Sequence, residues 1–443
     1  MTGLALRSLR HRSTAFTATF VTVLLGTVLI GSFATLVETA TGPVSDADAE
    51  SLIIMGAVVG GWGALIVLFS VASTMGITVR QRAVEIGLLR TVGATPRQAR
   101  RLIRFEALLV TAAAAAGGAA LAWPAGRGLL AMLRAGGMVA DDVEYGGGPA
   151  SLSLTAAGMV LTAMVATAIA GRRAVRGPAT LVLSEGRAQA GRMRWWRVAA
   201  GLLMIAYGAG LGVVTITVMA DDPDPYAAMQ TSGSAAILVG LGMATLAPVL
   251  LRWAGTLARP VLGASAAGHL AAYNSTRRSH LLAGVLAPVI VLTSTAVGVL
   301  MLVGIDGRTI GVVPDGEAET INLLNNVVTG MIALFAAIMV VNAFAAVIAD
   351  RQLELHRLHL VGATPDQVRG SVLAESAIVA ATGVLLGLVA SLATVVPFAV
   401  ARDEGVVPDG QLWLPPLIVA GVVALTLAAA RAALRRATAV PVR

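Results

Sequence analysis

The sequence predicts an all-α polytopic membrane protein with about ten transmembrane helices, arranged as two parallel four-helix repeats plus a central helix pair. Three observations support this fold class: an apolar composition, a series of long apolar segments, and an internal repeat. Of the 443 residues, 57% are hydrophobic and only 13% are charged, and the mean hydropathy is +0.82. A soluble domain carries about 25% charged residues, so the composition is typical of a chain that crosses a bilayer.

Ten apolar segments approach or exceed the about 20 residues that a membrane-spanning helix needs. The first follows three arginines, as the apolar part of a signal peptide would, but it is too long for one and no clear small-residue cleavage site follows it. We therefore expect a retained membrane helix. The third is expected to be the least regular, because Trp123, Pro124 and Arg127 interrupt it. In chain order, the predicted spans are residues 15–40, 52–79, 106–133, 152–171, 196–219, 234–252, 281–305, 321–348, 375–400 and 412–431.

The distribution of charge predicts how these helices are oriented. All 32 basic residues are arginine, and with a cytoplasmic N-terminus all but Arg127, Arg134, Arg308 and Arg402 fall in cytoplasmic segments. Most carboxylates fall on the outer side. Because a cytoplasmic excess of arginine sets helix orientation, we expect a multi-pass protein of the bacterial cytoplasmic membrane with both termini in the cytoplasm. The net charge of +8 then reflects topology and contact with membrane lipids, and no nucleic acid partner is expected.

A polar stretch of sequence occurs twice, 269 positions apart. "TVGATPRQAR" begins at Thr91 and "LVGATPDQVR" begins at Leu360, and eleven of 25 positions are identical between residues 82–106 and 351–375. Such a repeat indicates a duplicated unit. Both copies start inside and run four spans, so they are parallel repeats, expected to be related by an axis along the membrane normal. The predicted domains are 1–178, the first four-helix repeat; 179–265, a cytoplasmic linker with the central helix pair; and 266–443, the second repeat.

The repeated residues predict that one helix ends and another begins within a few positions. Gly93 suits the left-handed conformation just past a helix C-terminus. Thr95 is expected to be an N-cap, with Pro96 at the first helical position and Gln98 completing a capping box. The second copy carries the same residues at Gly362, Thr364, Pro365 and Gln367.

These hairpins allow two interpretations. They could be plain cytoplasmic connections whose arginines lie at the lipid headgroups. Apolar residues on the same turns favour the other interpretation, a surface that docks in a groove of another protein. A rigid hairpin continuous with two membrane helices also transmits movement, which a flexible loop does not. The apolar residues are Leu88, Leu89 and Val92 in the first copy and Leu358, Leu360 and Val361 in the second.

The two hairpin sequences, "RAVEIGLLRTVGATPRQARRLIRFEALL" and the weaker copy "RQLELHRLHLVGATPDQVRGSVLAESAI", resemble the signature of FtsX-like permeases. These are the membrane subunits of the MacB and FtsX class of ABC transporters. The resemblance covers the two four-helix units and implies that each hairpin contacts an ABC ATPase subunit, the two ATPases being identical or paralogous. The residues expected to couple to the ATPases are Arg82, Glu85, Leu89, Arg90, Gly93, Thr95, Pro96, Gln98, Arg351, Glu354, Leu358, Gly362, Thr364, Pro365 and Gln367.

Two features depart from that family. The connections after the first and seventh spans are too short for the large extracytoplasmic domain that the family commonly carries. The second hairpin has also diverged, with His356, Arg357 and His359 where the first copy has glycine, leucine and arginine. This divergence predicts unequal contacts with the two ATPases, or two different ATPase chains.

The sequence lacks the residues for several other chemistries. It contains no GxxxxGK[ST] phosphate loop, so we expect no enzyme activity and no cofactor in this chain, with ATP and Mg bound by the partner ATPase. His356 and His359 have a spacing that could hold a metal, but no third ligand is evident. A secondary carrier would need ionisable residues deep in the membrane. Glu106 and Glu375 instead lie at cytoplasmic ends, where we expect them to pair with arginines.

The sequence thus predicts the permease subunit of an ATP-driven exporter. Because no outer domain is present to hold a protein, we expect a small amphipathic or lipid-like substrate, such as an antibiotic. The alternative is a subunit that transports nothing and transmits ATP-driven movement to a cell-wall hydrolase or a sensor kinase. Short outer connections count against the alternative, since a regulated partner needs a surface to bind.

Overall fold

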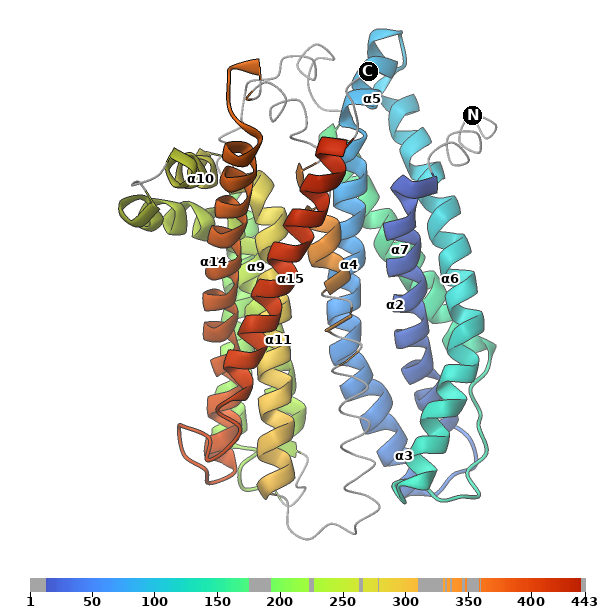
Figure 1. Cartoon of the computed structure of the whole chain (residues 1–443). Helices are drawn as coiled ribbons and strands as arrows, with labels where there is room; N and C mark the ends of the chain where they lie inside the picture. Colours follow the sequence, from blue (N-terminus) through green and yellow to red (C-terminus); the bar gives the residue numbers. More distant parts are fainter. Residues whose placement is uncertain are drawn as a thin grey trace. The chain divides into compact units, whose positions relative to one another are not determined.

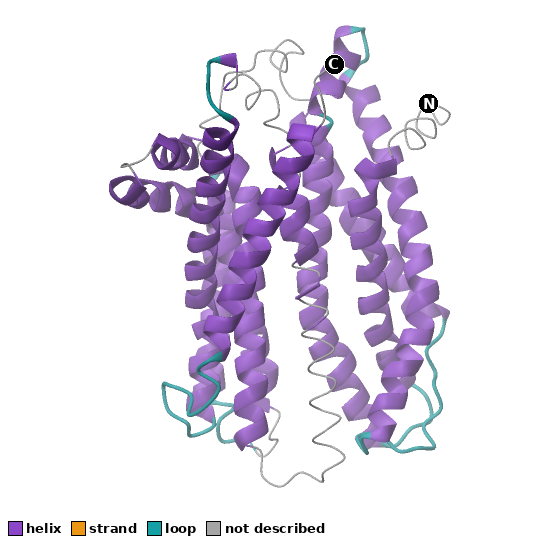
Figure 2. Cartoon of the chain, viewed as in Figure 1, coloured by secondary structure: helices purple, strands orange, loops and turns teal. Residues whose placement is uncertain are grey.

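A computed structural model gives the fold of the chain (Figure 1). Figure 2 shows helices joined by loops, and the described residues contain no strand, so the predicted all-α fold class is confirmed. The described residues are 13–174, 193–222, 227–262, 266–277, 279–309, 330, 333–334, 337–344, 347–348, 358 and 360–439.

Nine helices in the described residues are long and apolar enough to cross a membrane, and each corresponds to a predicted span. The remaining predicted span, 321–348, lies mostly outside the described residues. Two shorter helices, α5 (Ala83–Thr91) and α10 (Ala266–Arg277), lie between spans. The long helices are α2 (Ser13–Ala40), the run of α3 (Asp46–Ile53), η1 (Ile54–Val59) and α4 (Gly60–Gln81), α6 (Pro96–Ala135), α7 (Pro149–Ala174), α8 (Trp195–Thr217), α9 (Ala227–Leu262), α11 (Ser279–Thr309), α14 (Pro365–Ala401) and α15 (Leu414–Ala439).

The predicted irregularity of the third span is wrong. α6 runs as one helix from its first residue to its last, with Pro124 inside it. A proline removes one N–H from the helical ladder, and membrane helices tolerate this loss where neighbouring groups satisfy the backbone. Trp123 and Arg127 lie on the same helix one turn apart and do not interrupt it.

The helices from α2 to α7 form one compact unit, and those from α8 onward form another. In the first unit, α2 packs against α4, α6 and α7. Small residues allow this close approach: a Cβ on Gly118 of α6 would lie 2.6 Å from the backbone oxygen of Leu24 on α2. Close packing of this kind holds membrane helices together, because lipid supplies no hydrophobic driving force between them.

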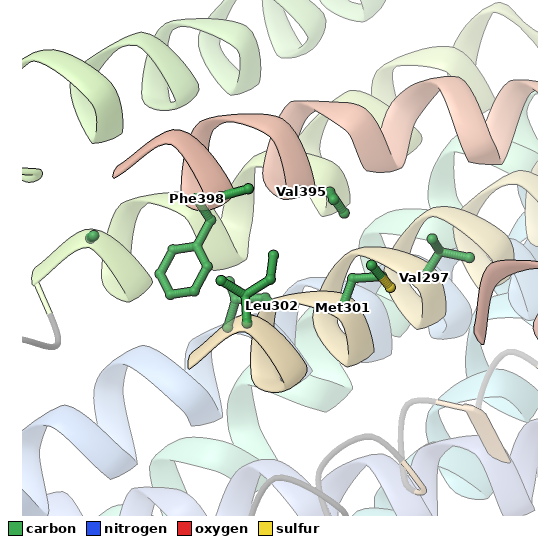
Figure 3. Close-up of a cluster of buried hydrophobic side chains, with 8 residues drawn as sticks. Val297, Met301, Leu302, Val395 and Phe398 are labelled. Atoms are coloured by element: carbon green, nitrogen blue, oxygen red, sulfur yellow. The ribbon is translucent and has the colours of Figure 1, made fainter. Parts of the chain in front are cut away.

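In the second unit, α11 is the central helix, with 94% of its most apolar stretch buried. It packs against α9, α14 and α15. Val297, Met301 and Leu302 of α11 meet Val395 and Phe398 of α14 in a cluster of buried side chains (Figure 3). α9 also packs against α8 and α14, so the central helix pair belongs to this unit.

The predicted repeat is visible in how helices pair within each unit. α2 packs on α6 as α11 packs on α14, and α6 packs on α7 as α14 packs on α15. α6 and α14 begin at Pro96 and Pro365, at the spacing of the sequence repeat. Equivalent sequences therefore make equivalent contacts in the two units.

A buried threonine joins α9 and α14 through the backbone. The hydroxyl of Thr394 donates to the carbonyl oxygen of Ser232 at 2.6 Å and accepts from the N–H of Ala236 at 2.9 Å. In a regular α-helix that carbonyl and that N–H pair with each other. The Thr394 hydroxyl therefore connects two backbone groups of α9 that are partners within the helix. The Ser232 hydroxyl in turn donates to the Thr394 carbonyl at 2.9 Å. The two helices are thereby fixed in register.

Thr394→Val is expected to lower the thermal unfolding midpoint of the purified protein. Valine keeps the shape of threonine but leaves two buried backbone groups without their bridge, at a cost of about 1–3 kcal/mol. Thr382→Val is the matched control, because the Thr382 hydroxyl bonds to the carbonyl of Ile378 in its own helix. Equal midpoints for the two variants would show that the bridge contributes nothing.

Candidate functional site

The first polar hairpin joins α4 to α6 through α5. Its turn is a Schellman motif: the N–H of Gly93 donates to the Arg90 carbonyl at 3.1 Å, and the N–H of Ala94 donates to the Leu89 carbonyl at 2.9 Å. Gly93 has φ +105°, a left-handed conformation that other residues rarely adopt. The predicted role of Gly93 as a helix stop is confirmed.

α6 then begins at a complete capping box. Thr95 is the N-cap, and its hydroxyl accepts from the N–H of Gln98 at 3.3 Å. The Gln98 side-chain oxygen accepts from the N–H of Thr95 at 2.9 Å. Pro96 occupies the first helical position, where its missing N–H removes no bond. The predicted capping box is confirmed, and the backbone N–H groups of Thr95 and Gln98 at the start of α6 have partners.

The second hairpin repeats this geometry at its tip. Gly362 has φ +99°, and the N–H of Ala363 donates to the Leu358 carbonyl at 3.0 Å. Thr364 and Gln367 form a capping box with the same two distances, 2.9 and 3.3 Å, and Pro365 again begins the helix. The turn depends on residues that are close together in the sequence, so the repeated sequence adopts the same conformation in both copies. Arg351 and Glu354 lie outside the described residues.

A small apolar core anchors each hairpin to its unit. In the first unit it contains Val79, Ile86, Ala99 and Ile103, with Ala170 of α7 packed against it. In the second it contains Ile348, Val368, Val372 and Leu434. Ile348, Val368 and Val372 are the repeat equivalents of Val79, Ala99 and Ile103. The first hairpin is thus continuous with two packed helices, and the second with α14.

A buried ion pair braces the first hairpin. Glu106 of α6 is fully buried, and its carboxylate accepts from both terminal nitrogens of Arg82, at the junction of α4 and α5. Arg82 also lies 3.5 Å from the carboxylate of Glu85 and stacks on Phe16, 5.6 Å from the ring centroid. The predicted pairing of Glu106 with a hairpin arginine is confirmed. Arg82 therefore lies inside the hairpin and supports it, rather than forming part of its exposed tip.

The second hairpin has a brace from a different helix. Glu375, 2% exposed, accepts from the side-chain amide of Asn274 at 2.6 Å. Asn274 belongs to α10, which lies across the direction of α14 (Figure 1). The sequence did not predict this contact, which joins residues 101 positions apart. The pairing of Glu375 with an arginine stays a prediction, because Arg351, the repeat equivalent of Arg82, lies outside the described residues.

The hairpin tips expose apolar side chains. Val92 is 89% exposed and Val361 is 87% exposed. Leu88, Leu89 and Leu360 beside them are also exposed. Polar helix ends that present apolar residues are suited to burial against another protein. The described residues bring no three His, Asp or Glu side chains together as a metal site, and His356 and His359 lie outside the described residues.

Comparison with known families agrees with this duplication. The sequence model of the FtsX-like permease C-terminal family matches residues 57–179 and 326–442, together more than half of the chain. The first match contains α4, α5, α6 and α7, and the second contains α14 and α15. No curated protein matches the chain at a significant level.

Proposed function

Because the chain belongs to the FtsX-like permease family, we propose that it is the permease of an ABC-type exporter of a small amphipathic or lipid-like compound, such as an antibiotic. Two ABC ATPase subunits, identical or paralogous, dock on the two hairpin tips from the cytoplasm. ATP and Mg are held by those subunits. One copy of this chain serves both ATPases, since it already contains two hairpins.

The observation that carries this proposal is the pair of matched tips. Both have a left-handed glycine, the same bond from the following alanine N–H to a leucine carbonyl, and the same capping box, and both expose a valine almost fully. Burying these apolar side chains on docking contributes about 25 cal/mol for each Å² removed from water. A cytoplasmic partner with two equivalent grooves fits this arrangement.

The first hairpin is also suited to transmit movement to its membrane helices. α5 is joined to α4 at Arg82, and the capping box of α6 follows the hydrogen-bonded turn directly. The buried Arg82–Glu106 pair holds the two sides of the hairpin together. When the ATPases close, each hairpin moves as one body with its two membrane helices, and this movement drives export.

The outer connections favour export over control of an outer partner. α2 ends at Ala40 and α3 begins at Asp46, and α14 ends at Ala401 while α15 begins at Leu414. Such short connections give a hydrolase or a sensor kinase little to bind. The alternative, mechanical control of such a partner, predicts ATPase activity that responds to that partner and not to a small molecule.

Loosening the tip is expected to reduce coupling without preventing assembly. Thr95→Ala removes about 1 kcal/mol of capping, which is too little to unfold a membrane protein of this size. We expect the variant to insert and bind the ATPases, while substrate-stimulated ATP hydrolysis in lipid and efflux from cells both fall. Gly93→Val added to Thr95→Ala should reduce coupling further, because a β-branched residue misfits a φ of +105°. Thr364→Ala should be the milder change, because the second hairpin has diverged.

The matched control is Thr41→Ala, an exposed threonine whose hydroxyl bonds to the Glu38 carbonyl at the opposite end of the unit. It should leave both activities unchanged. Full efflux and normal stimulation in the Gly93→Val, Thr95→Ala double variant would show that the hairpin is a connection and not a lever. Nucleotide binding by the isolated chain would contradict the assignment of ATP to the partner.

A further inference from the structure

An arginine near the outer end of α6 is held between two aromatic rings. The guanidinium carbon of Arg127 lies 4.1 Å from the ring centroid of Trp123 and 5.7 Å from that of Tyr145. The two rings are 6.3 Å apart and meet edge to face at 76°. Trp123 precedes Arg127 by one helical turn, and Tyr145 lies in the connection to α7. Stacking on both rings fixes the plane of the guanidinium.

Glycines let Tyr145 reach this position. A Cβ on Gly126 would lie 2.7 Å from the Tyr145 hydroxyl, and one on Gly147 would lie 2.4 Å from its ring. The hydroxyl donates to the Trp123 carbonyl at 3.1 Å. Desolvation raises the pKa of Tyr145, so the phenol stays protonated and keeps this bond. The aromatic clamp is therefore part of the packed structure of the first unit.

Arg127 differs from two other arginines predicted at the outer side in forming no ion pair among the described residues. Arg308 and Arg402, at the predicted outer end of the second unit, pair with Glu404 at 3.0 Å and with Asp306 at 2.9 Å. Arg127 is exposed, and no carboxylate among the described residues forms an ion pair with it. The Glu38 carboxylate is used elsewhere, where it accepts from the N–H groups of Gly148 and Ser151 at 3.0 Å each.

The position of Arg127 in α6 places it at a lipid headgroup layer. At about 1.5 Å per residue, this helix is roughly twice as long as the hydrocarbon core is thick. Its first turns belong to the hairpin, and Arg127 lies about two turns before its other end. Leu121 and Trp123, on the same stretch, are exposed. Tryptophan and tyrosine gather at the membrane–water interface, so this aromatic pair marks that level.

From this geometry we propose that Arg127 binds the phosphate of an outer-leaflet phospholipid. Trp123 covers one face of the Arg127 guanidinium. The N–H groups at the edge of the guanidinium are then available to donate to phosphate oxygens. The exposed side chains of Trp123 and Pro124, which lie about one turn before Arg127 on the same side of α6, contact the glycerol and acyl carbons. A phospholipid fits these neighbours better than free phosphate does, because a soluble anion would leave the apolar side chains in water. The site lies wholly in the first unit and does not depend on an ATPase.

The test is lipid binding by the purified full chain without ATPase, measured by native mass spectrometry in detergent. Phosphatidylglycerol is titrated, with diacylglycerol and inorganic phosphate as separate competitors. We expect one tightly bound phosphatidylglycerol whose affinity falls about tenfold in Arg127→Gln, the scale of one lost charge-assisted hydrogen bond. The affinity of Arg127→Lys should lie between those of the unchanged protein and Arg127→Gln, because lysine keeps the charge but lacks the planar guanidinium that stacks on Trp123.

Arg97→Gln, an exposed arginine in the first turn of the same helix, should leave this affinity unchanged. The thermal unfolding midpoint of each variant without added lipid shows whether the fold is intact. Unchanged lipid affinity in a folded Arg127→Gln variant would overturn the proposal. Displacement of the lipid by inorganic phosphate alone would also overturn it, in favour of a site for soluble anions. Because no ATPase is present, neither outcome bears on the docking of the hairpins.

Discussion

Replacing both Val92 and Val361 by aspartate is expected to abolish binding of the ATPase subunits. These are the most exposed apolar side chains of the two tips, at 89% and 87%. A residue at the centre of an interface commonly contributes 2 kcal/mol or more, and a carboxylate forced into a dry apolar contact adds a desolvation cost. We therefore expect the affinity to fall at least about 30-fold per tip. The measurements are co-purification with the ATPase and efflux from cells.

The fold of the double variant should be intact, since both side chains lie in solvent and contact little of the chain. Val406→Asp is the matched control: Val406 is an exposed valine in the loop between α14 and α15, at the predicted outer side. It should bind the ATPase normally. The single variants rank the hairpins, and Val92→Asp is expected to be the more severe. Normal co-purification of the double variant would show that the ATPase binds elsewhere.

The parts of the fold that the sequence predicts correctly depend on local chemistry. Gly93, Thr95, Pro96 and Gln98 lie within six positions, and each has a strong preference for one place in a helix–turn–helix connection. The repeat then predicts a second tip without further information. The spans follow from apolar length alone, which explains why nine of them agree with the described helices.

The parts that could not be predicted depend on which helices become neighbours. Thr394 bridges Ser232 and Ala236 across more than 150 positions, and no periodicity in either helix marks them as partners. Asn274 of α10 reaches Glu375 across 101 positions, and no pattern in the sequence marks the two as partners. Threonine and asparagine occur in many spans, so only the packing reveals which of them join helices.

The prediction that Arg82 contacts the ATPase shows that a repeated residue alone does not reveal its neighbours in the fold. Its repetition at Arg351 suggested a contact with the ATPase. The structure places it at the base of the hairpin, paired with buried Glu106. A charge can recur because it supports a structure as well as because it binds a partner. The exposed valines at the tip, which carry no charge, are the better candidates for direct docking.

Arg82→Ala is expected to be the most destabilising single change in the hairpin. Glu106 has no exposed surface, so removing the arginine leaves a buried carboxylate without its counter-ion. Breaking such a pair costs about 3–5 kcal/mol, because the charge stays out of water and loses its partner. The thermal unfolding midpoint should fall clearly, and limited proteolysis should cut near α5. Arg369→Ala is the matched control, since its pair with Asp366 at 3.5 Å is largely exposed, and exposed pairs contribute about 0–1 kcal/mol.

A second substitution separates the cost of an unpaired charge from the role of the pair. In the Arg82→Met, Glu106→Leu double variant, no charge is left buried, and apolar residues of similar volume often replace such a pair at little cost. We expect its midpoint to recover most of the loss seen in Arg82→Ala. If it recovers and efflux stays low, the pair is needed to transmit movement, since stability alone would then not explain the defect. If Arg82→Ala shifts the midpoint no more than Arg369→Ala does, the buried pair does not support the hairpin and the lever must be held by its apolar core alone.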